Sequence, residues 1–270
     1  MAGKISFENE LILHLITQKH LKELFDLECV ASEMQLHKLR LDNLAFDEKH
    51  SRFVIIEYKN VFSANVLNQA QDYHDLVLNN RKEFLERLKN PKNIDFGNTL
   101  VMIIGPEFSE EQINEAKSYF ELWQVSLYDD NIVEYKQLKT GKTITLKVTD
   151  DELKLSEDDL LKNKTVEIHE LYGALKNCVK DRFGDVECKI LVDEISLNIN
   201  GKIICNVKFL KKSFNVYFYS KELVDEKNRL RDISDIGTGG KANCELKINS
   251  KSDLDYFMNL FKQAYAQKRE

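Results

Sequence analysis

The sequence lacks the features that mark membrane and secreted proteins. None of its apolar runs approaches the about 20 residues that a membrane-spanning helix needs. Its first residues, Met1 to Glu8, contain no apolar core of the signal-peptide kind. Its five cysteines include no Cys-x-x-Cys pair, which argues against a zinc site, and we interpret them as small buried residues in a reducing compartment. We therefore expect a cytoplasmic protein that does not enter a membrane.

The sequence also lacks an excess of positive charge. Its 39 lysines and arginines against 45 aspartates and glutamates give a formal net charge of −6, which excludes a uniformly basic surface. A local basic stripe remains compatible with this balance. The segment 81–92 contains Arg81, Lys82, Arg87, Lys89 and Lys92. It is typical of a solvated helix face, and it is also a candidate nucleic-acid stripe, in which we single out Arg81 and Lys82.

The order of predicted elements indicates an α/β protein with two domains. We assign residues 1–148 to a domain with a mixed central sheet covered by helices, residues 149–164 to a charged linker, and residues 165–270 to a smaller α+β domain. A capping box at Ser109 begins a helix that we expect to reach about Leu122. The other elements expected in the first domain are helices at 7–27 and 65–88, a hairpin at 40–59, and strands at 99–104, 123–128 and 132–138.

The second domain is expected to begin and end with a helix. The apolar spacing predicts helices at 166–183 and from Ser252 onward. Between them the pattern predicts five strands, near 187–192, 196–199, 203–209, 214–219 and 244–248.

The predicted hairpin places charged side chains on one face. If its turn centres at residues 49–50, Asp42 lies directly across from Glu57. On the same face, Arg40 then lies across from Lys59. Two facing carboxylates repel, and the cost grows with burial, so we expect a cation between them. A divalent metal held by oxygen ligands is the natural candidate, although a slip of one residue would undo this register.

The Glu-x-Lys triplet that ends the hairpin is weak evidence by itself, because the chain contains six such triplets. This copy differs from the others because the apolar run Phe53 to Ile56 leads into it. Gln69 and Tyr73 follow it at a helical spacing of four residues. The alternative interpretation is structural: Asp42 is then an exposed hairpin residue, the triplet is a surface pair worth under about 1 kcal/mol, and the Gln–Tyr spacing is coincidental.

Together these residues resemble the PD-(D/E)XK nuclease superfamily, which has the restriction-endonuclease-like fold. They are most similar to the branch with an added Gln-x-x-x-Tyr motif, which includes the archaeal-type mismatch and branched-DNA endonucleases. The matching segment runs from about Glu10 to Ile104. One position departs from the pattern, because Leu41 stands where the motif has proline.

The resemblance implies a metal site. Asp42 and Glu57 would hold Mg²⁺, or Mn²⁺ in its place, with the backbone carbonyl of Tyr58 as a third ligand. Glu10 corresponds to an additional acidic residue that reaches the metal through water, although a glutamate near a helix start also suits the helix dipole. Phosphodiester hydrolysis needs a nucleophilic water and stabilisation of charge on the phosphate, and Mg²⁺ keeps several of its waters.

The resemblance assigns the other site residues to the substrate. Lys59 would orient the attacking water or neutralise the transition state. Gln69 and Tyr73 would fix the phosphate, or Lys59, from the adjacent helix. Arg40 is a candidate phosphate contact.

We therefore expect a metal-dependent endonuclease that hydrolyses phosphodiester bonds in DNA, in repair or defence. A homodimer is a further expectation, because a duplex has two strands to cut. The alternative is a catalytically silent protein that uses the fold as a scaffold for nucleic acid or another partner.

The second domain adds architecture but no mechanism. It is similar to an uncharacterised C-terminal domain that is often attached to such nuclease domains in prokaryotic proteins. A third hypothesis, a small-molecule or nucleotide sensor, rests on Gly237, Gly239 and Gly240, which form either an anion-binding loop or a flexible turn.

Overall fold

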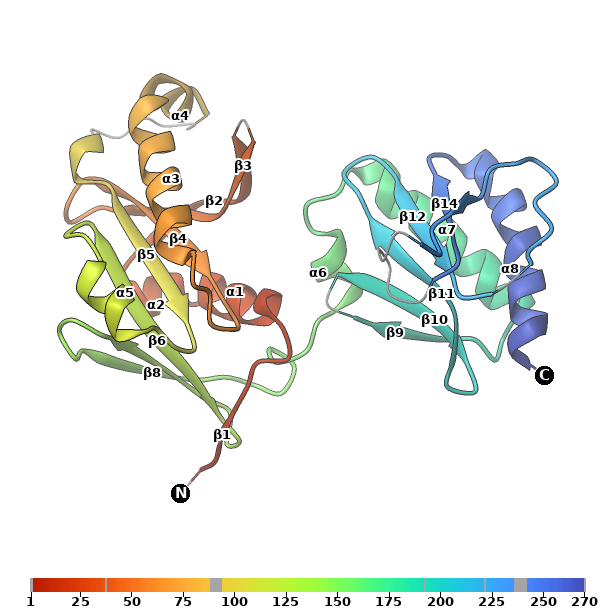
Figure 1. The fold of residues 1–270 in the computed structure, drawn as a ribbon, viewed down its shortest axis with the longest axis horizontal. Helices are drawn as coiled ribbons and strands as arrows, with labels where there is room; N and C mark the ends of the chain where they lie inside the picture. The colour runs from red at the N-terminus through yellow and green to blue at the C-terminus, as the bar shows by residue number, and fades with distance from the viewer. Residues whose placement is uncertain are drawn as a thin grey trace. The chain divides into compact units, whose positions relative to one another are not determined.

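The chain folds as two compact units, Met1–Lys154 and Leu155–Glu270. The boundary lies inside the segment expected to be a linker. That segment contains a short helix, α6 (Glu157–Leu161), which is capped by Ser156 and buries two leucines. The computed structural model (Figure 1) describes residues 2–36, 38–87, 94–191, 193–220, 222–235 and 242–269.

The first unit is built on a mixed sheet of eight strands. Its order is β2-β3-β4-β5-β6-β7-β8, and β1 pairs with β6. The central pairs β4–β5 and β5–β6 are parallel, and the other pairs are antiparallel. The strands are β1 (Lys4–Ile5), β2 (Glu28–Leu36), β3 (Leu39–Asp47), β4 (Arg52–Tyr58), β5 (Leu100–Gly105), β6 (Phe120–Tyr128), β7 (Ile132–Gln137) and β8 (Thr143–Lys147).

Helices cover both faces of this sheet (Figure 1), which confirms the predicted fold class. On one face, His14 of α1 stacks on Tyr58 of β4, and Phe25 of α2 packs against Trp123. On the other face, α3, α4 and α5 pack over a large apolar cluster. The helices are α1 (Glu10–Lys19), α2 (Leu21–Phe25), α3 (Val66–Asn79), α4 (Arg81–Arg87) and α5 (Glu110–Glu115), with a 3₁₀ turn η1 (Phe96–Asn98) before β5.

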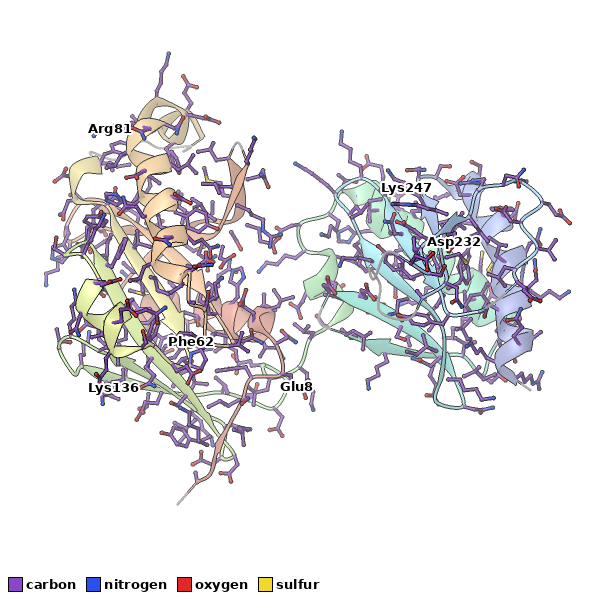
Figure 2. The ribbon with its side chains drawn as sticks, viewed as in Figure 1. Glu8, Phe62, Arg81, Lys136, Asp232 and Lys247 are labelled. Atoms are coloured by element: carbon purple, nitrogen blue, oxygen red, sulfur yellow. The ribbon has the colours of Figure 1, made fainter. Side chains whose placement is uncertain are left out.

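The helical segment predicted at 65–88 forms two helices. α3 ends at Asn79, and α4 begins at Arg81, so Asn80 separates them. This break places α4 at one end of the unit, and Figure 2 shows Arg81 far from Phe62, which lies on the loop before α3.

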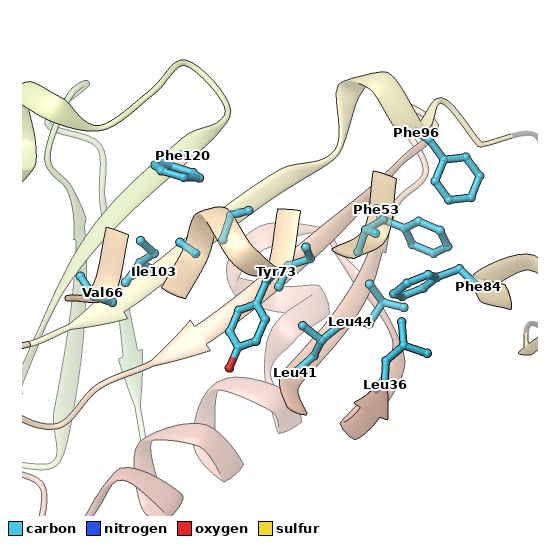
Figure 3. Packing of buried hydrophobic residues seen from close by; sticks show 14 of the residues in the cluster. Leu36, Leu41, Leu44, Phe53, Val66, Tyr73, Phe84, Phe96, Ile103 and Phe120 are labelled. Atoms are coloured by element: carbon cyan, nitrogen blue, oxygen red, sulfur yellow. The ribbon is translucent and has the colours of Figure 1, made fainter. Parts of the chain in front are cut away.

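The apolar cluster is centred on strands that are buried on both faces. Every residue of β5 is buried, as the sequence predicts for its continuous apolar run. Phe53 of β4 packs against Phe96 and Phe84, with ring centroids 5.6 and 6.1 Å apart (Figure 3). Tyr73 of α3 joins the same cluster but directs its hydroxyl out of it (Figure 3). The cluster therefore fixes α3 against β4 at the point where polar side chains begin.

Three strands of the first unit, β1, β2 and β8, were not predicted. The predicted end of the helix near Leu122 is wrong, because α5 ends at Glu115 although its capping box forms as expected. Ala116 is already extended, and β6 begins at Phe120, where parallel pairing with β5 begins at Val101. Burial of an aromatic strand between β5 and β7 outweighs the local helical preference of this segment.

The second unit is an antiparallel sheet of six strands in the order β13-β14-β12-β11-β10-β9. Two long helices pack on one face, where Tyr172 of α7 contacts Phe209 and Phe257 of α8 contacts Phe218. The elements are α7 (Val166–Arg182), β9 (Glu187–Ile190), β10 (Glu194–Ile199), β11 (Lys202–Phe209), β12 (Phe214–Phe218), β13 (Arg231–Asp232), β14 (Cys244–Ile248), a 3₁₀ turn η2 (Lys251–Asp253) and α8 (Leu254–Arg269).

Candidate active site

The register of the β3–β4 hairpin confirms the predicted turn. Asn43 pairs with Ile56 and Phe46 pairs with Phe53, so the turn centres between residues 49 and 50. Continued by one residue, this register opposes Asp42 and Glu57, and the charge of Asp42 acts on the pKa of Glu57. Side chains at directly opposed positions have Cβ atoms about 4.5–5.5 Å apart, within reach of one ion.

The backbone of β4 holds Asp42 in this place. The N–H of Tyr58 donates to Oδ2 of Asp42 at 3.1 Å. The side chain of Tyr58 points to the opposite face of the sheet, where its hydroxyl donates to Oδ1 of Asn43 at 2.7 Å. Because that phenol is fully buried and engaged, only the main chain of Tyr58 is available to the Asp42 face.

Glu57 is the most constrained group of the site. It is 1% exposed, and its Oε1 lies 2.5 Å from Nζ of Lys59. Its Oε2 is buried and accepts no hydrogen bond from a donor within the described part of the chain. The carboxyl of Asp42 is close enough for a hydrogen bond between the two carboxyls, which also raises the pKa of Glu57. Burial, and then the charge of Asp42, raise the pKa of Glu57 to about 8 against the opposing effect of Lys59. The positive charge of Lys59 therefore offsets only part of the cost of ionising the buried Glu57 carboxyl.

Lys59 keeps its positive charge although its side chain is largely buried. Its side chain is 19% exposed. Burial lowers the pKa of Lys59, but the charge and hydrogen bond of Glu57, together with Glu10 and Asp42, raise it above the ordinary value. Its position on the Glu57 face follows from the alternation of side chains along the strand.

Helix α1 brings a third carboxyl to the site. Asn9 caps this helix by accepting the N–H of Ile12 at 2.9 Å, which sets Glu10 in the first turn. The Glu10 carboxylate accepts a backbone N–H from Asn60, directly after Lys59. Burial raises the pKa of Glu10, and the charges of Lys59 and Asp42 act on it in opposite directions. Glu10 is therefore part of the same electrostatic cluster.

Helix α3 supplies the two neutral polar groups. Nε2 of Gln69 donates to the hydroxyl of Tyr73 at 2.8 Å. Burial raises the pKa of Tyr73, the bond from Gln69 lowers it, and the charges of Glu57 and Asp42 raise it further. The predicted spacing of four residues thus places both side chains on the face of α3 that meets the hairpin.

The predicted basic residues divide into two groups. Arg40 is exposed, and its charge lowers the pKa of Glu10, so it lies at the site. Arg81 donates to the carbonyl of Leu78, and Lys82 lies 3.9 Å from Glu86. The rise of α3 separates these two from Gln69 by about 15 Å or more. The structure does not bring them to this site, and their contact with nucleic acid stays a prediction. Lys89 and Lys92 lie outside the described residues, as do Gly237, Gly239 and Gly240.

The sequence analysis missed a buried polar layer beneath the site. Asn43 is completely buried next to Asp42 and accepts the Tyr58 hydroxyl. His14 stacks on the Tyr58 ring with centroids 4.8 Å apart. An asparagine directly before the apolar run Leu44 to Phe46 was the available signal. The bond between Asn43 and Tyr58 keeps these two side chains on one face of the sheet. The neighbouring Asp42 and Glu57 are therefore held on the opposite face.

The oxygen donors of the site are of the kind that magnesium accepts. Glu10, Asp42 and Glu57 do not form a three-ligand site, because no group of three or more His, Cys, Asp or Glu side chains among the described residues is arranged to hold a metal ion. Mg²⁺ is commonly bound by one or two carboxylates, with water and substrate as its other ligands. Two facing carboxylates, one of them with an unpartnered buried oxygen, match this requirement. The residues present therefore fit the ion that the resemblance implies.

None of the described helices combines the length and the apolarity needed to cross a bilayer.

Comparison with known proteins gives two similarities. No family model matches the chain. An uncharacterised protein of Haemophilus influenzae is 28% identical over 260 residues, which is 87% of this chain and 85% of that protein. The solved EndoMS–dsDNA2 complex is similar to 42% of this chain and 43% of its own chain, with 11% identity and a TM-score of 0.31. Because the Haemophilus match covers 87% of the chain, it extends over both units.

Proposed function

We propose that the first unit is a metal-dependent nuclease domain that hydrolyses phosphodiester bonds in DNA. The observation that carries this proposal is the buried Glu57 carboxyl beside Asp42, whose Oε2 accepts no hydrogen bond from a donor among the described residues. Lys59 pairs with Oε1 and leaves Oε2 without a donor, and folded proteins rarely leave a buried polar oxygen in this state. The resemblance of the hairpin and α3 to the PD-(D/E)XK pattern supplies the reaction class.

The charge balance of the site supports a divalent cation. Three carboxyls, from Glu10, Asp42 and Glu57, stand against the two cations Arg40 and Lys59. When bound, Mg²⁺ would supply a polarised phosphoryl oxygen and a water of lowered pKa. Asp42 and Glu57 would hold it, and the carbonyl of Tyr58 would complete the set from the protein.

The residues of the chain have separate tasks in this proposal. Lys59 keeps its proton on Nζ and turns from Oε1 of Glu57 toward the phosphate or the attacking water. Preorganised cations of this kind act where charge develops in the transition state. Gln69 and Tyr73 hold the phosphate or Lys59 in position, and the exposed Arg40 contacts the backbone of the nucleic acid.

One observation favours the alternative of a catalytically silent scaffold. Lys59 and Glu57 already form an ion pair at 2.5 Å, which is stable without a metal if Asp42 stays solvated. The same fold would then bind nucleic acid or a partner without cleaving it. Cleavage and metal binding separate the two possibilities.

A cleavage assay tests the proposed function directly. We expect the wild-type protein to cut plasmid or oligonucleotide DNA with Mg²⁺ or Mn²⁺ and not with EDTA. Lys59→Ala should lower the rate by about 10²–10³-fold, because it removes a cation placed at the developing charge. Lys136→Ala is a matched control, since Glu134-Tyr135-Lys136 repeats the triplet on β7. Equal rates for Lys59→Ala and the wild type would overturn the proposal.

The polar pair on α3 gives a smaller, graded prediction. Tyr73→Phe should lower the cleavage rate by about 10-fold with little change in folding, because it removes one positioning hydroxyl and keeps the buried ring. Gln69→Ala should produce a similar loss, and the double variant should lose little more, since the two groups act as a unit. Tyr119→Phe, which removes a hydroxyl bonded to Gln71 on the same helix, is the control. Additive losses in the double variant would contradict a shared role.

A further inference from the structure

Two exposed apolar side chains of the first unit follow Lys59 closely in the chain. Among its described residues, the large hydrophobic side chains that are exposed are Ile5 (45%), Val61 (63%) and Phe62 (45%). Ile5 lies on β1 opposite Leu127 and lines a separate cavity of about 50 Å³. Val61 and Phe62 follow Lys59 and Asn60 directly in the chain. We call Val61 and Phe62 the apolar rim. Neighbouring exposed apolar groups mark interaction sites more often than isolated ones do.

The apolar rim is held between fixed points of the backbone. The N–H of Lys59 donates to the carbonyl of Ile104 at 2.9 Å. Nε2 of the buried Gln112 donates to the carbonyl of Ser63 at 2.8 Å. Phe62 thus lies between two anchored residues, and its Cα is at most about 11 Å from that of Lys59. A nucleotide next to a phosphate held by Lys59 would reach it.

The size of the apolar rim favours a small occupant. One aromatic side chain buries about 150–250 Å² even when it is covered completely. Two partly exposed side chains therefore present far less than the about 800 Å² that each partner contributes to a stable protein interface. The area suits a single planar group, and the neighbouring cations Lys59 and Arg40 suit the phosphates on either side of it.

We propose that the apolar rim contacts an unstacked nucleobase beside the scissile phosphate, with the Phe62 ring stacked on the base. This inference rests on the proposed function, because the phosphate at Lys59 sets where the base lies. Stacking tolerates any base, so the apolar rim selects strands whose base next to the cut is out of the duplex stack, and it reads no sequence.

Binding of oligonucleotides in EDTA tests this inference without cleavage. The probes are single-stranded and fully paired DNA with 2-aminopurine at successive positions, read by anisotropy and by quenching of the 2-aminopurine. Phe62→Ala should weaken single-strand binding by roughly 5–150-fold and abolish the quenching at one position. Phe62→Trp should keep both. Val166→Ala, a change at an exposed apolar residue of the second unit, should alter neither.

The outcomes separate this inference from the proposed function. Wild-type binding that is unchanged in Phe62→Ala would overturn the role of the apolar rim and leave the nuclease proposal standing. Equal rescue by Phe62→Leu and Phe62→Trp would also overturn stacking. Self-association that is lost in Phe62→Ala, with unchanged binding of DNA, would identify a protein interface instead. Absence of binding to any oligonucleotide would overturn both proposals.

Discussion

Glu57→Gln should abolish both metal binding and DNA cleavage while leaving the fold intact. Glutamine keeps the shape of the side chain but cannot provide the charge that holds a divalent cation opposite Asp42. We expect the cleavage rate to fall by at least about 10³-fold, a larger loss than for any other single change at the site. Titration calorimetry with Mn²⁺ should show a binding heat for the wild type and none for the variant.

The chain provides its own control for this experiment. Glu134→Gln changes the same residue type in the second Glu-Tyr-Lys triplet, on β7. The residues paired with Glu134 are Ser126 and Thr145, and neither is a carboxylate. This variant should bind Mn²⁺ and cleave DNA as the wild type does. If Glu57→Gln still shows a metal-binding heat, the ion binds somewhere other than the hairpin.

The same substitution should stabilise the metal-free protein at high pH. The pKa of Glu57 rises from 4.5 to about 8 in the folded protein. The native state therefore binds the proton more tightly than the unfolded chain does, and stability falls as the pH rises between these two values. Below about pH 4.5 the effect is absent, and above about pH 8 it is complete. Its size is on the order of 5 kcal/mol.

Chemical denaturation in EDTA measures this effect as a difference between two proteins. At pH 5 the wild type and Glu57→Gln should unfold at similar denaturant concentrations, and at pH 9 the variant should be the more stable protein. Adding Mg²⁺ at pH 9 should stabilise the wild type and not the variant, because ligands stabilise only the state that binds them. Parallel pH profiles for both proteins would show that Glu57 does not titrate in a shifted range.

The hairpin register was predictable because its determinants are local. Alternation of apolar residues fixes which face each strand buries, and the polar turn fixes the pairing. The opposition of Asp42 and Glu57 follows from these two facts alone. The capping box at Ser109 and the buried strand β5 were predictable for the same reason, since each depends on neighbours in the sequence.

Other parts of the fold depend on contacts between distant segments. β2 is an edge strand whose pairing with β3 shifts between Cys29 and Ala31, and Glu33 has a φ of 49°. Such a strand has no regular alternation to detect. The end of α5 is set by β6 pairing with β5, which lies earlier in the chain. Patterns of neighbouring residues therefore predict neither the irregular pairing of β2 nor the end of α5.

The candidate site shows the same division. Gln69 and Tyr73 share a helix, so their spacing predicts their common face. The approach of Glu10 to Lys59 brings together segments separated by the whole hairpin, and only the family resemblance indicated it. The basic segment at 81–92 was ambiguous, because charge alone does not show where a helix ends. The break at Asn80 and the rise of α3 carry Arg81 away from the site.

Crystals of the protein soaked in Mn²⁺ and measured at the manganese absorption edge provide the most direct test of the central claim, which is that Asp42 and Glu57 share one divalent cation. We predict an anomalous peak about 2.0–2.3 Å from an oxygen of each carboxylate, with Lys59 displaced from Glu57. An ion pair between Lys59 and Glu57 that persists, with no peak beside it at millimolar Mn²⁺, would contradict the account.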